Sequence, residues 1–251
     1  MSTSNVMDQS LLAVKRHFDN PQWYLCGRTY HVRMRVNVVG HFLKGGSFER
    51  ILDVGCGDGS ISLPFVGPGK RLTLLDLSDS MLTYAKSRVP AELASSVEIV
   101  NGDFMNARLD ADAYDLIFCL GVLAYVNPVK PFVQKLERLL KPGGTVLVEC
   151  HDWRHPVSQM SLVCDRLIGV FRKPAYQVAL HSRRAIMSEF ANMGFRLRGQ
   201  YRYTSPVRLV RRFLTPEWQF RLISAIHGDA ARNRFQWLGD ECIFHFTKAA
   251  R

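Results

Sequence analysis

Residues 51–59 read ILDVGCGDG, and this stretch decides the fold of the chain. A short apolar strand pattern reaches Asp53 and runs within two residues into a loop that contains three glycines. Glycines at such a point let the backbone turn sharply and approach a ligand closely. Their spacing is G-x-G-x-G with an acid before it, which differs from the G-x-G-x-x-G of dinucleotide-binding loops. We therefore expect a ligand-binding loop that follows the first strand of a sheet.

Strand and helix patterns alternate on both sides of this loop. Strands are expected at 51–54, 71–76, 97–101, 114–120, 145–150, 195–203 and 241–247. Helices are expected at 6–18, at 22–43, from about Ser60, and at 79–88, 130–140, 182–193, 206–213 and 216–227. The central strands are apolar on both faces, which is typical of a parallel sheet covered by helices on both sides.

Polar residues follow the carboxyl ends of the expected strands, where open parallel sheets bind their ligands. Asp53 suits a cationic amino group, and Asp76 can accept hydrogen bonds from two ribose hydroxyls. NAD enzymes use an acid like Asp76 in the same way, so that residue alone does not discriminate. Asp103 could accept from an adenine amino group with Phe104 against the ring, the less favoured alternative being that Asp103 is a turn residue.

Five motifs in succession carry a family resemblance. ILDVGCGDG, LLDLSDSML, VNGDF, YDLIFCLGVLAYV and LLKPGGTVLVE, within residues 50–150, resemble in order and spacing the motifs of class I S-adenosylmethionine-dependent methyltransferases. The resemblance implies an α/β fold: a Rossmann-like three-layer sandwich with a mostly parallel seven-stranded sheet and an antiparallel last strand. It also implies S-adenosyl-L-methionine as cofactor, S-adenosyl-L-homocysteine as product, and a small-molecule acceptor that is anionic or natural-product-like.

The same resemblance implies roles for individual residues. The methionine moiety is expected at Asp53, Gly55, Cys56 and Gly57, above Leu120 and Gly121. The ribose is expected at Asp76, and the adenine at Leu77, Met81, Asp103 and Phe104. Simple core packing is the alternative for Leu77 and Met81. The family often places an aromatic or basic residue of an N-terminal helix over the methionine carboxylate, for which we prefer Tyr30, with Arg35 or Tyr24 as alternatives.

The acceptor site is expected outside the cofactor motifs. Residues 1–46 are predicted to form a helical arm that covers the substrate, and residues 47–251 the cofactor-binding domain, with insertions at about 152–180 and 205–235. Methyl transfer from a sulfonium is an in-line displacement, so the protein mainly aligns the two reactants. A general base is needed only where the nucleophile must lose a proton.

Three residues are the candidates for catalysis. His151 or His155 would be the base and Tyr125 an orienting hydroxyl, the alternative being that either histidine only packs on a loop. No metal is expected, because Pro156 favours extended geometry at His155 and two histidines four residues apart share a face only in a helix.

The basic excess behind the net charge of +11 lies outside the cofactor motifs, since residues 151–251 carry 17 basic and 7 acidic residues. Seven arginines alternate with aromatic residues over 196–221. This segment could bind an anionic small molecule, lie on an anionic membrane with a lipid- or quinone-like acceptor, bind RNA, or form a solvated basic face. RNA ranks last, because GVLAY follows the fourth strand where base-amino methyltransferases have Asn/Asp-Pro-Pro-aromatic. A cofactor-binding subunit without transfer activity is a further alternative.

The remaining features concern location and assembly. No run of 18 apolar residues predicts a membrane span, and the first residues do not resemble a signal peptide, so a cytoplasmic protein is expected. Six cysteines without a CxxC pair indicate buried free thiols in a reducing compartment. We expect a monomer or a homodimer.

Overall fold

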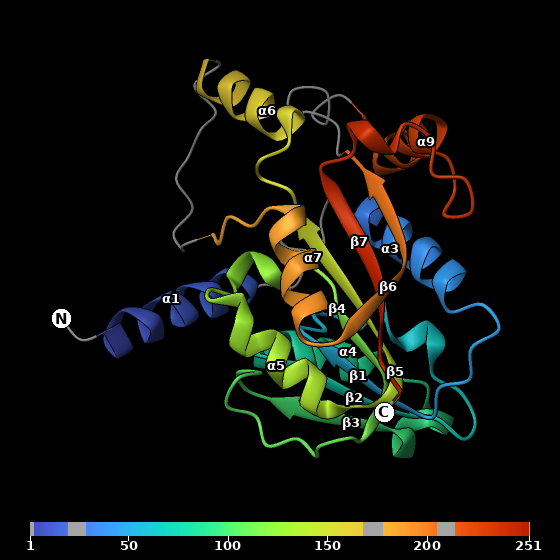
Figure 1. Cartoon of the computed structure of the whole chain (residues 1–251). Helices are drawn as coiled ribbons and strands as arrows, with labels where there is room; N and C mark the ends of the chain where they lie inside the picture. Colours follow the sequence, from blue (N-terminus) through green and yellow to red (C-terminus); the bar gives the residue numbers. More distant parts are fainter. Residues whose placement is uncertain (1–2, 20–28, 168–177, 205–213, 251) are drawn as a thin grey trace.

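The computed structural model describes residues 3–19, 29–167, 178–204 and 214–250. A seven-stranded sheet with the order β3-β2-β1-β4-β5-β7-β6 forms its centre (Figure 1). β1 to β5 are parallel to one another, whereas β7 runs antiparallel between β5 and β6. This confirms the predicted Rossmann-like α/β sandwich with its antiparallel last strand. The strands are β1 (Arg50–Val54), β2 (Arg71–Asp76), β3 (Val97–Asn101), β4 (Tyr114–Cys119), β5 (Leu140–His151), β6 (Phe195–Tyr203) and β7 (Glu241–Lys248).

Helices cover both faces of the sheet. The α-helices are α1 (Thr3–Phe18), α3 (Thr29–Phe42), α4 (Asp79–Ser87), α5 (Val129–Leu139), α6 (Pro156–Leu167), α7 (Arg183–Asn192) and α9 (Pro216–His227). Short 3-10 turns lie at η1 (Leu63–Phe65), η2 (Ala91–Ser96), η3 (Leu123–Tyr125) and η4 (Gln236–Leu238). Phe132 of α5 and Phe190 of α7 belong to the core on one face. Met34 of α3, Leu82 of α4 and Ile223 of α9 belong to the core on the other.

Side-chain caps fix the helix starts that the sequence predicts. Ser78 accepts a hydrogen bond from the Met81 amide at the start of α4, and Ser182 accepts one from the Ala185 amide at the start of α7. Each cap satisfies an amide that has no partner within its helix. These serines therefore set where the two helices begin.

The helix predicted from about Ser60 is wrong. Between the glycine loop and β2 the chain forms only turns and the three-residue η1. Pro64 lies at the start of η1, and Pro68 between two glycines disfavours helical geometry at Gly67. A helix from Ser60 would therefore have fewer than two turns, too few to be stable.

Other boundaries also differ from the predictions. β5 begins at Leu140 instead of residue 145, and α6 occupies a segment for which no helix was predicted. The predicted helix 206–213 and residues 22–28 lie outside the described residues. The division at residue 46 stays a prediction; α3 packs into the same core cluster as the strands beneath it.

Five cysteines fall within the described residues. Cys56, Cys119, Cys150 and Cys242 are buried free thiols, as predicted, while Cys164 is free and exposed. Cys26 lies outside the described residues. No helix in the described part of the chain is both long and apolar enough to cross a membrane.

Candidate cofactor and acceptor site

The glycine loop is held against the end of β2. The amides of Gly55 and Cys56 donate to the Leu75 carbonyl at 2.8 and 3.1 Å. Gly55 has a φ of +67°, and a Cβ there would lie 2.6 Å from Val122 Cγ2. Glycine is therefore required both by the backbone conformation and by the close approach of the loop after β4.

Asp53 is a buried carboxylate at the start of this loop. Its side chain is 3% exposed, and its Oδ2 atom has no hydrogen-bond partner. Burial raises the pKa of Asp53 from 3.8 to about 7; the Ser62 hydroxyl opposes the shift, and the charges of Asp76 and Asp58 add to it. A buried carboxylate oxygen without a partner is costly unless a ligand supplies a donor. Asp53 therefore suits a cationic group.

Asp76 ends the neighbouring strand and shapes the other side of the loop. Its Oδ2 accepts from the Gly57 amide at 2.8 Å, and its Oδ1 accepts from the Ser78 amide at 2.9 Å. Burial raises the pKa of Asp76, and these backbone donors oppose that rise. Each oxygen has a second lone pair, so the carboxylate can accept further hydrogen bonds from a pair of hydroxyls.

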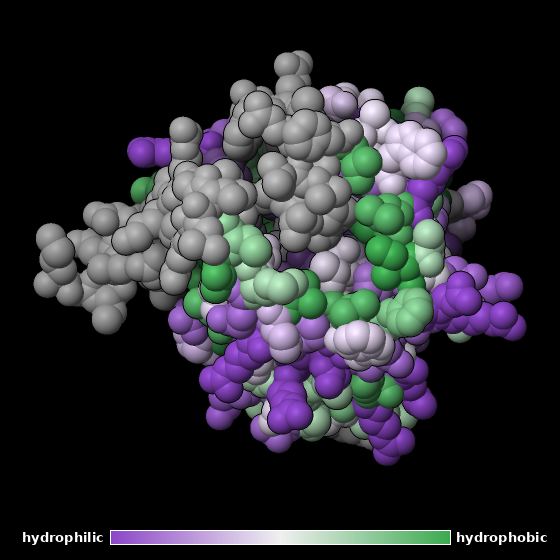
Figure 2. Space-filling model, turned by 90° about the horizontal axis from the view of Figure 1, so that it is seen from above, coloured by the Kyte–Doolittle hydropathy of each residue, from purple (hydrophilic) through white to green (hydrophobic). Residues whose placement is uncertain are grey.

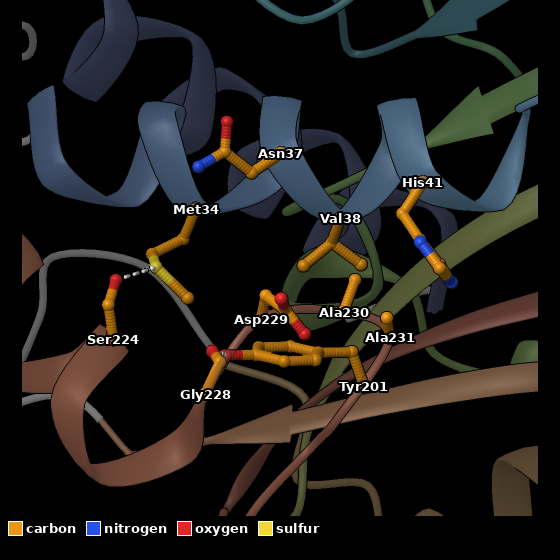
Figure 3. A pocket seen from close by; sticks show the side chains of 10 residues that line it. All are labelled: Met34, Asn37, Val38, His41, Tyr201, Ser224, Gly228, Asp229, Ala230 and Ala231. Atoms are coloured by element: carbon orange, nitrogen blue, oxygen red, sulfur yellow. Dashed lines mark hydrogen bonds between the residues drawn. The ribbon is translucent and has the colours of Figure 1, made fainter.

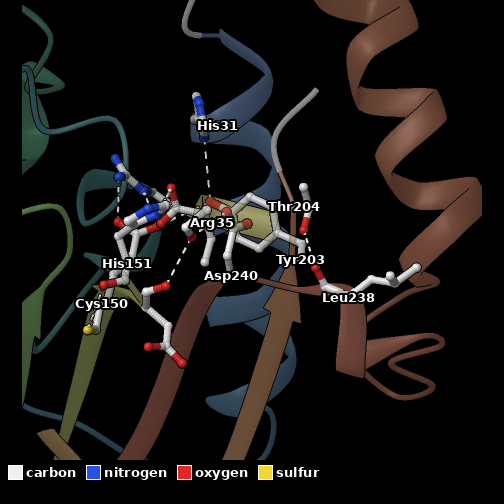
Figure 4. A network of polar contacts seen from close by, with 12 residues as sticks. His31, Arg35, Cys150, His151, Tyr203, Thr204, Leu238 and Asp240 are labelled. Atoms are coloured by element: carbon white, nitrogen blue, oxygen red, sulfur yellow. Dashed lines mark hydrogen bonds and ion pairs between the residues drawn. The ribbon is translucent and has the colours of Figure 1, made fainter. Parts of the chain in front are cut away.

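A polar network runs from α3 to the end of β5 (Figure 4). Arg35 Nε donates to Glu149 Oε1 at 3.1 Å, and a second guanidinium nitrogen donates to Oε2. Tyr203 donates its hydroxyl proton to the same Oε1 at 3.1 Å and lies 3.5 Å from His31 Nδ1. Sequence analysis did not identify Glu149, although an acid within the apolar strand TVLVEC is a usable signal.

Arg35 also reaches the loop after β4. A Cβ on Gly121, whose φ is +80°, would lie 3.1 Å from an Arg35 guanidinium nitrogen. Leu120, just before it, is buried in the core cluster that includes α3. The guanidinium therefore lies above the Leu120–Gly121 segment, where the sequence predicts the methionine end of the cofactor.

Tyr30, the arm residue preferred for the methionine carboxylate, lies in the core instead. It is fully buried in the core between α3 and the sheet, and its ring lies 4.0 Å from that of His31. Arg35, the stated alternative, presents its guanidinium to Gly121 in the loop after β4. Tyr24, the other alternative, lies outside the described residues.

The residues predicted to bind adenine form two groups, Leu77 with Met81 near the start of α4 and Asp103 with Phe104 after β3. Leu77 is partly exposed and Met81 is buried at the start of α4. Asp103 accepts from the Met105 amide and the Asn106 side chain, so its oxygens stabilise its own turn. Phe104 packs against Phe132 in the core, with ring centroids 4.8 Å apart. Phe104 is therefore directed toward α5.

His151 lies at the end of β5 and pairs with an acid. Its Nδ1 is 3.1 Å from Glu241 Oε1. Burial would lower the pKa of His151, but the Glu241 hydrogen bond and charge, with Asp240 and Asp152, raise it to about 9. The imidazole is thus protonated at neutral pH. This does not fit the general base expected of His151.

His155 uses both ring nitrogens to hold the backbone. Its Nδ1 accepts from the Val157 amide at 3.3 Å, and its Nε2 donates to the Trp237 carbonyl at 2.9 Å. These two bonds fix one neutral tautomer and join the start of α6 to η4. This arrangement corresponds to the alternative of a histidine that packs on a loop.

Tyr125 lies where several segments converge above the end of β4. Its ring meets that of Phe18, at the end of α1, edge to face with centroids 5.6 Å apart. His181 Nε2 is 2.8 Å from the Val126 carbonyl, and its own carbonyl accepts from the Trp153 amide. Phe18 and His181 are neighbours of the acceptor side that sequence analysis did not identify.

The basic C-terminal segment is only partly described. Arg202 is bound to the Gly239 carbonyl through two nitrogens, and Tyr201 and Tyr203 are fully buried. These aromatic rings are therefore unavailable for base stacking. Arg208, Arg211 and Arg212 lie outside the described residues.

A separate cavity of about 450 Å³ lies between α3 and the segment after α9 (Figure 3). Met34, Val38, His41, Tyr201 and Asp229 are among its lining residues. None of the predicted cofactor or catalytic residues lines it. Within the described residues, no group of three His, Cys, Asp or Glu side chains is arranged to hold a metal ion.

Comparisons with known proteins agree with this geometry. A family model described as a methyltransferase domain matches residues 52–148. The ubiquinone biosynthesis O-methyltransferase of Nitrosomonas europaea is 31% identical over 133 residues, 51% of this chain and 54% of that protein. The malonyl-[acyl-carrier protein] O-methyltransferase of Enterobacter lignolyticus is 33% identical over 99 residues, 39% of this chain and 38% of that protein. The chain thus spans about half or less of the length of these relatives.

One solved structure resembles nearly the whole chain. The magnesium protoporphyrin IX methyltransferase of Synechocystis, solved with bound S-adenosylhomocysteine, superposes with a TM-score of 0.64. The match covers 96% of this chain and all of that one at 16% identity, so it establishes the fold alone. Residues 52–148 thus match the model of a methyltransferase domain, and the chain shares the fold of this solved methyltransferase structure.

Proposed function

We propose that this chain binds S-adenosylmethionine and transfers its methyl group to a small-molecule acceptor. One observation carries the proposal: two acids, the buried Asp53 and the partly buried Asp76, lie at the ends of neighbouring strands on either side of the glycine loop. The family match over residues 52–148 supports the same reading.

The methionine moiety of the cofactor has an ammonium and a carboxylate group. Asp53 and Arg35 offer one charge of opposite sign to each of them. Asp53 has a buried oxygen without a partner, which suits the ammonium of the methionine moiety. Arg35, above Gly121, suits the carboxylate. We therefore assign the carboxylate to Arg35 in place of Tyr30, with Glu149 holding the guanidinium in position.

The nucleoside would lie along the ends of β2 and β3. Asp76 would accept from the ribose hydroxyls through its remaining lone pairs. Leu77 and Met81 would form the wall beside the adenine. Asp103 stays a candidate for the adenine amino group, whereas the packing of Phe104 against Phe132 leaves it a role in the core.

The bound cofactor would supply an activated methyl group, so alignment is the main task of the protein. For an acceptor hydroxyl, the residues above the cleft must also remove a proton. We propose His31 for this role. Glu149 accepts the Tyr203 proton, so the Tyr203 hydroxyl can accept a hydrogen bond from His31 Nδ1–H and orient the imidazole. Tyr125 stays the candidate for orienting the acceptor.

The position of His31 follows from the helix that carries it. His31 and Arg35 are four residues apart on α3, so they share one face of the helix. Because we assign the methionine carboxylate to Arg35, we place the acceptor one turn away along α3, beside His31. The relatives named above are O-methyltransferases of small or carrier-bound acceptors, which supports an acceptor oxygen here.

Calorimetry with S-adenosylmethionine and S-adenosylhomocysteine tests the central claim. Asp76→Ala should weaken binding by about a hundredfold or more, because two charge-assisted hydrogen bonds are lost. Asp79→Ala, which removes an exposed acid three residues away, is the matched control and should bind as the wild type does. Absence of binding by the wild type, or full affinity of Asp76→Ala, would refute the proposal.

A further inference from the structure

Helix α9 carries apolar side chains on a buried face and on an adjoining exposed one. Its inner face buries Ile223 against α3 and the sheet. Its outer face exposes Trp218, Leu222 and Ile226 by 59%, 40% and 37%. Residues at this spacing lie on one side of a helix. A surface helix in water normally has a polar outer face, so the outer side of α9 is suited to an apolar contact.

Two more aromatic side chains are exposed just after α9. Phe235 and Trp237 are exposed by 54% and 66%. The chain between them and α9 folds back on the helix, since the Arg234 amide donates to the His227 carbonyl. We call Trp218, Leu222, Ile226, Phe235 and Trp237 the apolar end face.

Arginines accompany this face. The Arg221 guanidinium lies over the Trp218 ring, 5.4 Å from its centroid. Arg232 and Arg234 are exposed in the segment that joins α9 to Phe235. Of the nearby acids, Glu217 is paired with Arg33 and Arg221. Exposed tryptophans beside arginines are typical of surfaces that lie in the boundary region of a lipid bilayer.

Trp237, in the apolar end face, lies close to the segment that follows β5. The Trp237 carbonyl is bound by His155, four residues beyond the end of β5. Figure 1 places α9 beyond the upper ends of the strands, and Figure 2, seen from above, shows hydrophobic side chains in the middle of this end with hydrophilic ones at its lower margin.

We propose that the apolar end face docks on the surface of an anionic phospholipid bilayer. The apolar side chains would enter the boundary of the acyl region while the arginines contact the headgroups. A second copy of the chain would cover the same side chains but bring like charges together. RNA could stack on Trp218, Phe235 and Trp237 but would leave Leu222 and Ile226 without an apolar partner, which an acyl region supplies. This docking does not depend on the proposed methyl transfer.

Sedimentation of the full chain with vesicles tests the proposal. Phosphatidylcholine vesicles with added phosphatidylglycerol should bind the protein, and phosphatidylcholine alone should bind it at least about tenfold less. Replacing Trp218, Leu222 and Ile226 by serine should abolish binding to both. Reversing Arg221, Arg232 and Arg234 to glutamate should reduce binding to the anionic vesicles by about a hundredfold or more.

A matched control uses exposed apolar residues elsewhere. Tyr84→Ser and Leu197→Ser alter side chains that are 42% and 38% exposed on α4 and β6, and both should bind as the wild type does. Circular dichroism establishes that each variant is folded. Wild-type protein that fails to bind anionic vesicles, or a folded triple serine variant that binds them fully, overturns the proposal. A concentration-dependent dimer that the triple serine variant converts to a monomer would overturn it in favour of a second copy.

Discussion

Arg35 on α3 and Glu149 on β5 form an ion pair that is largely withdrawn from water. The two side chains are 19% and 5% exposed, and the guanidinium donates to both carboxylate oxygens. Glu149→Gln should lower the free energy of unfolding by about 3 kcal/mol, because it leaves a charge in a low-dielectric site without its counterion. Urea unfolding measures this loss. Glu217→Gln, which removes a half-exposed partner of Arg33, is the control and should change stability little.

The same variant tests the position of the guanidinium. If Glu149 holds Arg35 over the cleft, Glu149→Gln should weaken S-adenosylhomocysteine binding by about tenfold, the loss expected when one oriented ionic contact is disturbed. Unchanged affinity in a folded variant would mean that Arg35 does not bind the carboxylate of the ligand.

Cofactor affinity should depend on pH through Asp53. Its pKa of about 7 in the free protein means that a proton must leave before an ammonium can pair with it. Affinity should rise about tenfold per pH unit up to about 7 and then level off, until the α-amino group of the ligand loses its proton near pH 8. Calorimetry from pH 5.5 to 9, with Asp53→Asn expected to lack the lower limb, measures this; a flat wild-type profile would contradict it.

Asp53→Asn should stabilise the unliganded protein at high pH. The pKa of Asp53 is higher in the folded state than its usual 3.8, so the folded state binds more protons between those values. The contribution of Asp53 to stability therefore falls as the pH rises from about 4 to about 7. At pH 8 the variant should gain up to about 4 kcal/mol in the free energy of unfolding, and below pH 4 almost nothing. Denaturant titrations at the two pH values give the comparison; an equal effect at both would exclude Asp53 as the cause.

His151 should titrate as half of an ion pair. Its raised pKa means that its contribution to stability is complete below pH 6.5 and is lost as the pH rises through about 9. Glu241→Gln removes the largest raising influence, so the pKa of His151 should fall to its usual value or lower, as burial then dominates. Proton NMR of the imidazole follows the titration, and a pKa that stays near 9 in the variant would show that Glu241 is not its cause.

His31 should take the proton from the acceptor if the acceptor group is a hydroxyl. His31→Gln should lower kcat by about a hundredfold to ten-thousandfold, with the KM for the cofactor unchanged. Tyr203→Phe should also lower kcat, because Tyr203 orients His31. His155→Gln is the control: it removes the bond to the Trp237 carbonyl and should reduce stability without lowering kcat. Full kcat in His31→Gln would assign the proton to another group.

The sequence predicts the sheet well because its signals are local. The apolar strand runs, the serine caps of α4 and α7 and the acids at strand ends each depend on a few neighbouring residues. The sequence alone could therefore put Asp53 and Asp76 at the ends of two strands. The partners of the histidines could not. His151 and Glu241 meet through antiparallel pairing of β5 with β7, and His155 meets Trp237 across 82 residues. Contacts of this range decide which partner each histidine binds.

The N-terminal arm, residues 1–46, also shows that contacts between distant residues could not be predicted from the sequence. Helical spacing puts Tyr30 and Arg35 on one helix but does not say which of them turns toward the cleft. The structure answers through Glu149, whose charge draws Arg35 toward β5, while Tyr30 fills the core. An acid within an apolar strand was the available signal for this pairing.

The three-residue η1 stands where a full helix was expected after the glycine loop. Its short length affects which nucleotides can bind at that loop. A helix that starts at the glycine loop would direct the positive end of its dipole and several free amides at a ligand phosphate. Here η1 is too short to do so, and Asp53 places a carboxylate beside the loop, whereas Asp58 is paired with Arg88. A pyrophosphate would meet repulsion from Asp53, whereas an S-adenosyl compound, which has no phosphate and a cationic end, would not. We therefore expect the glycine loop to discriminate against dinucleotides.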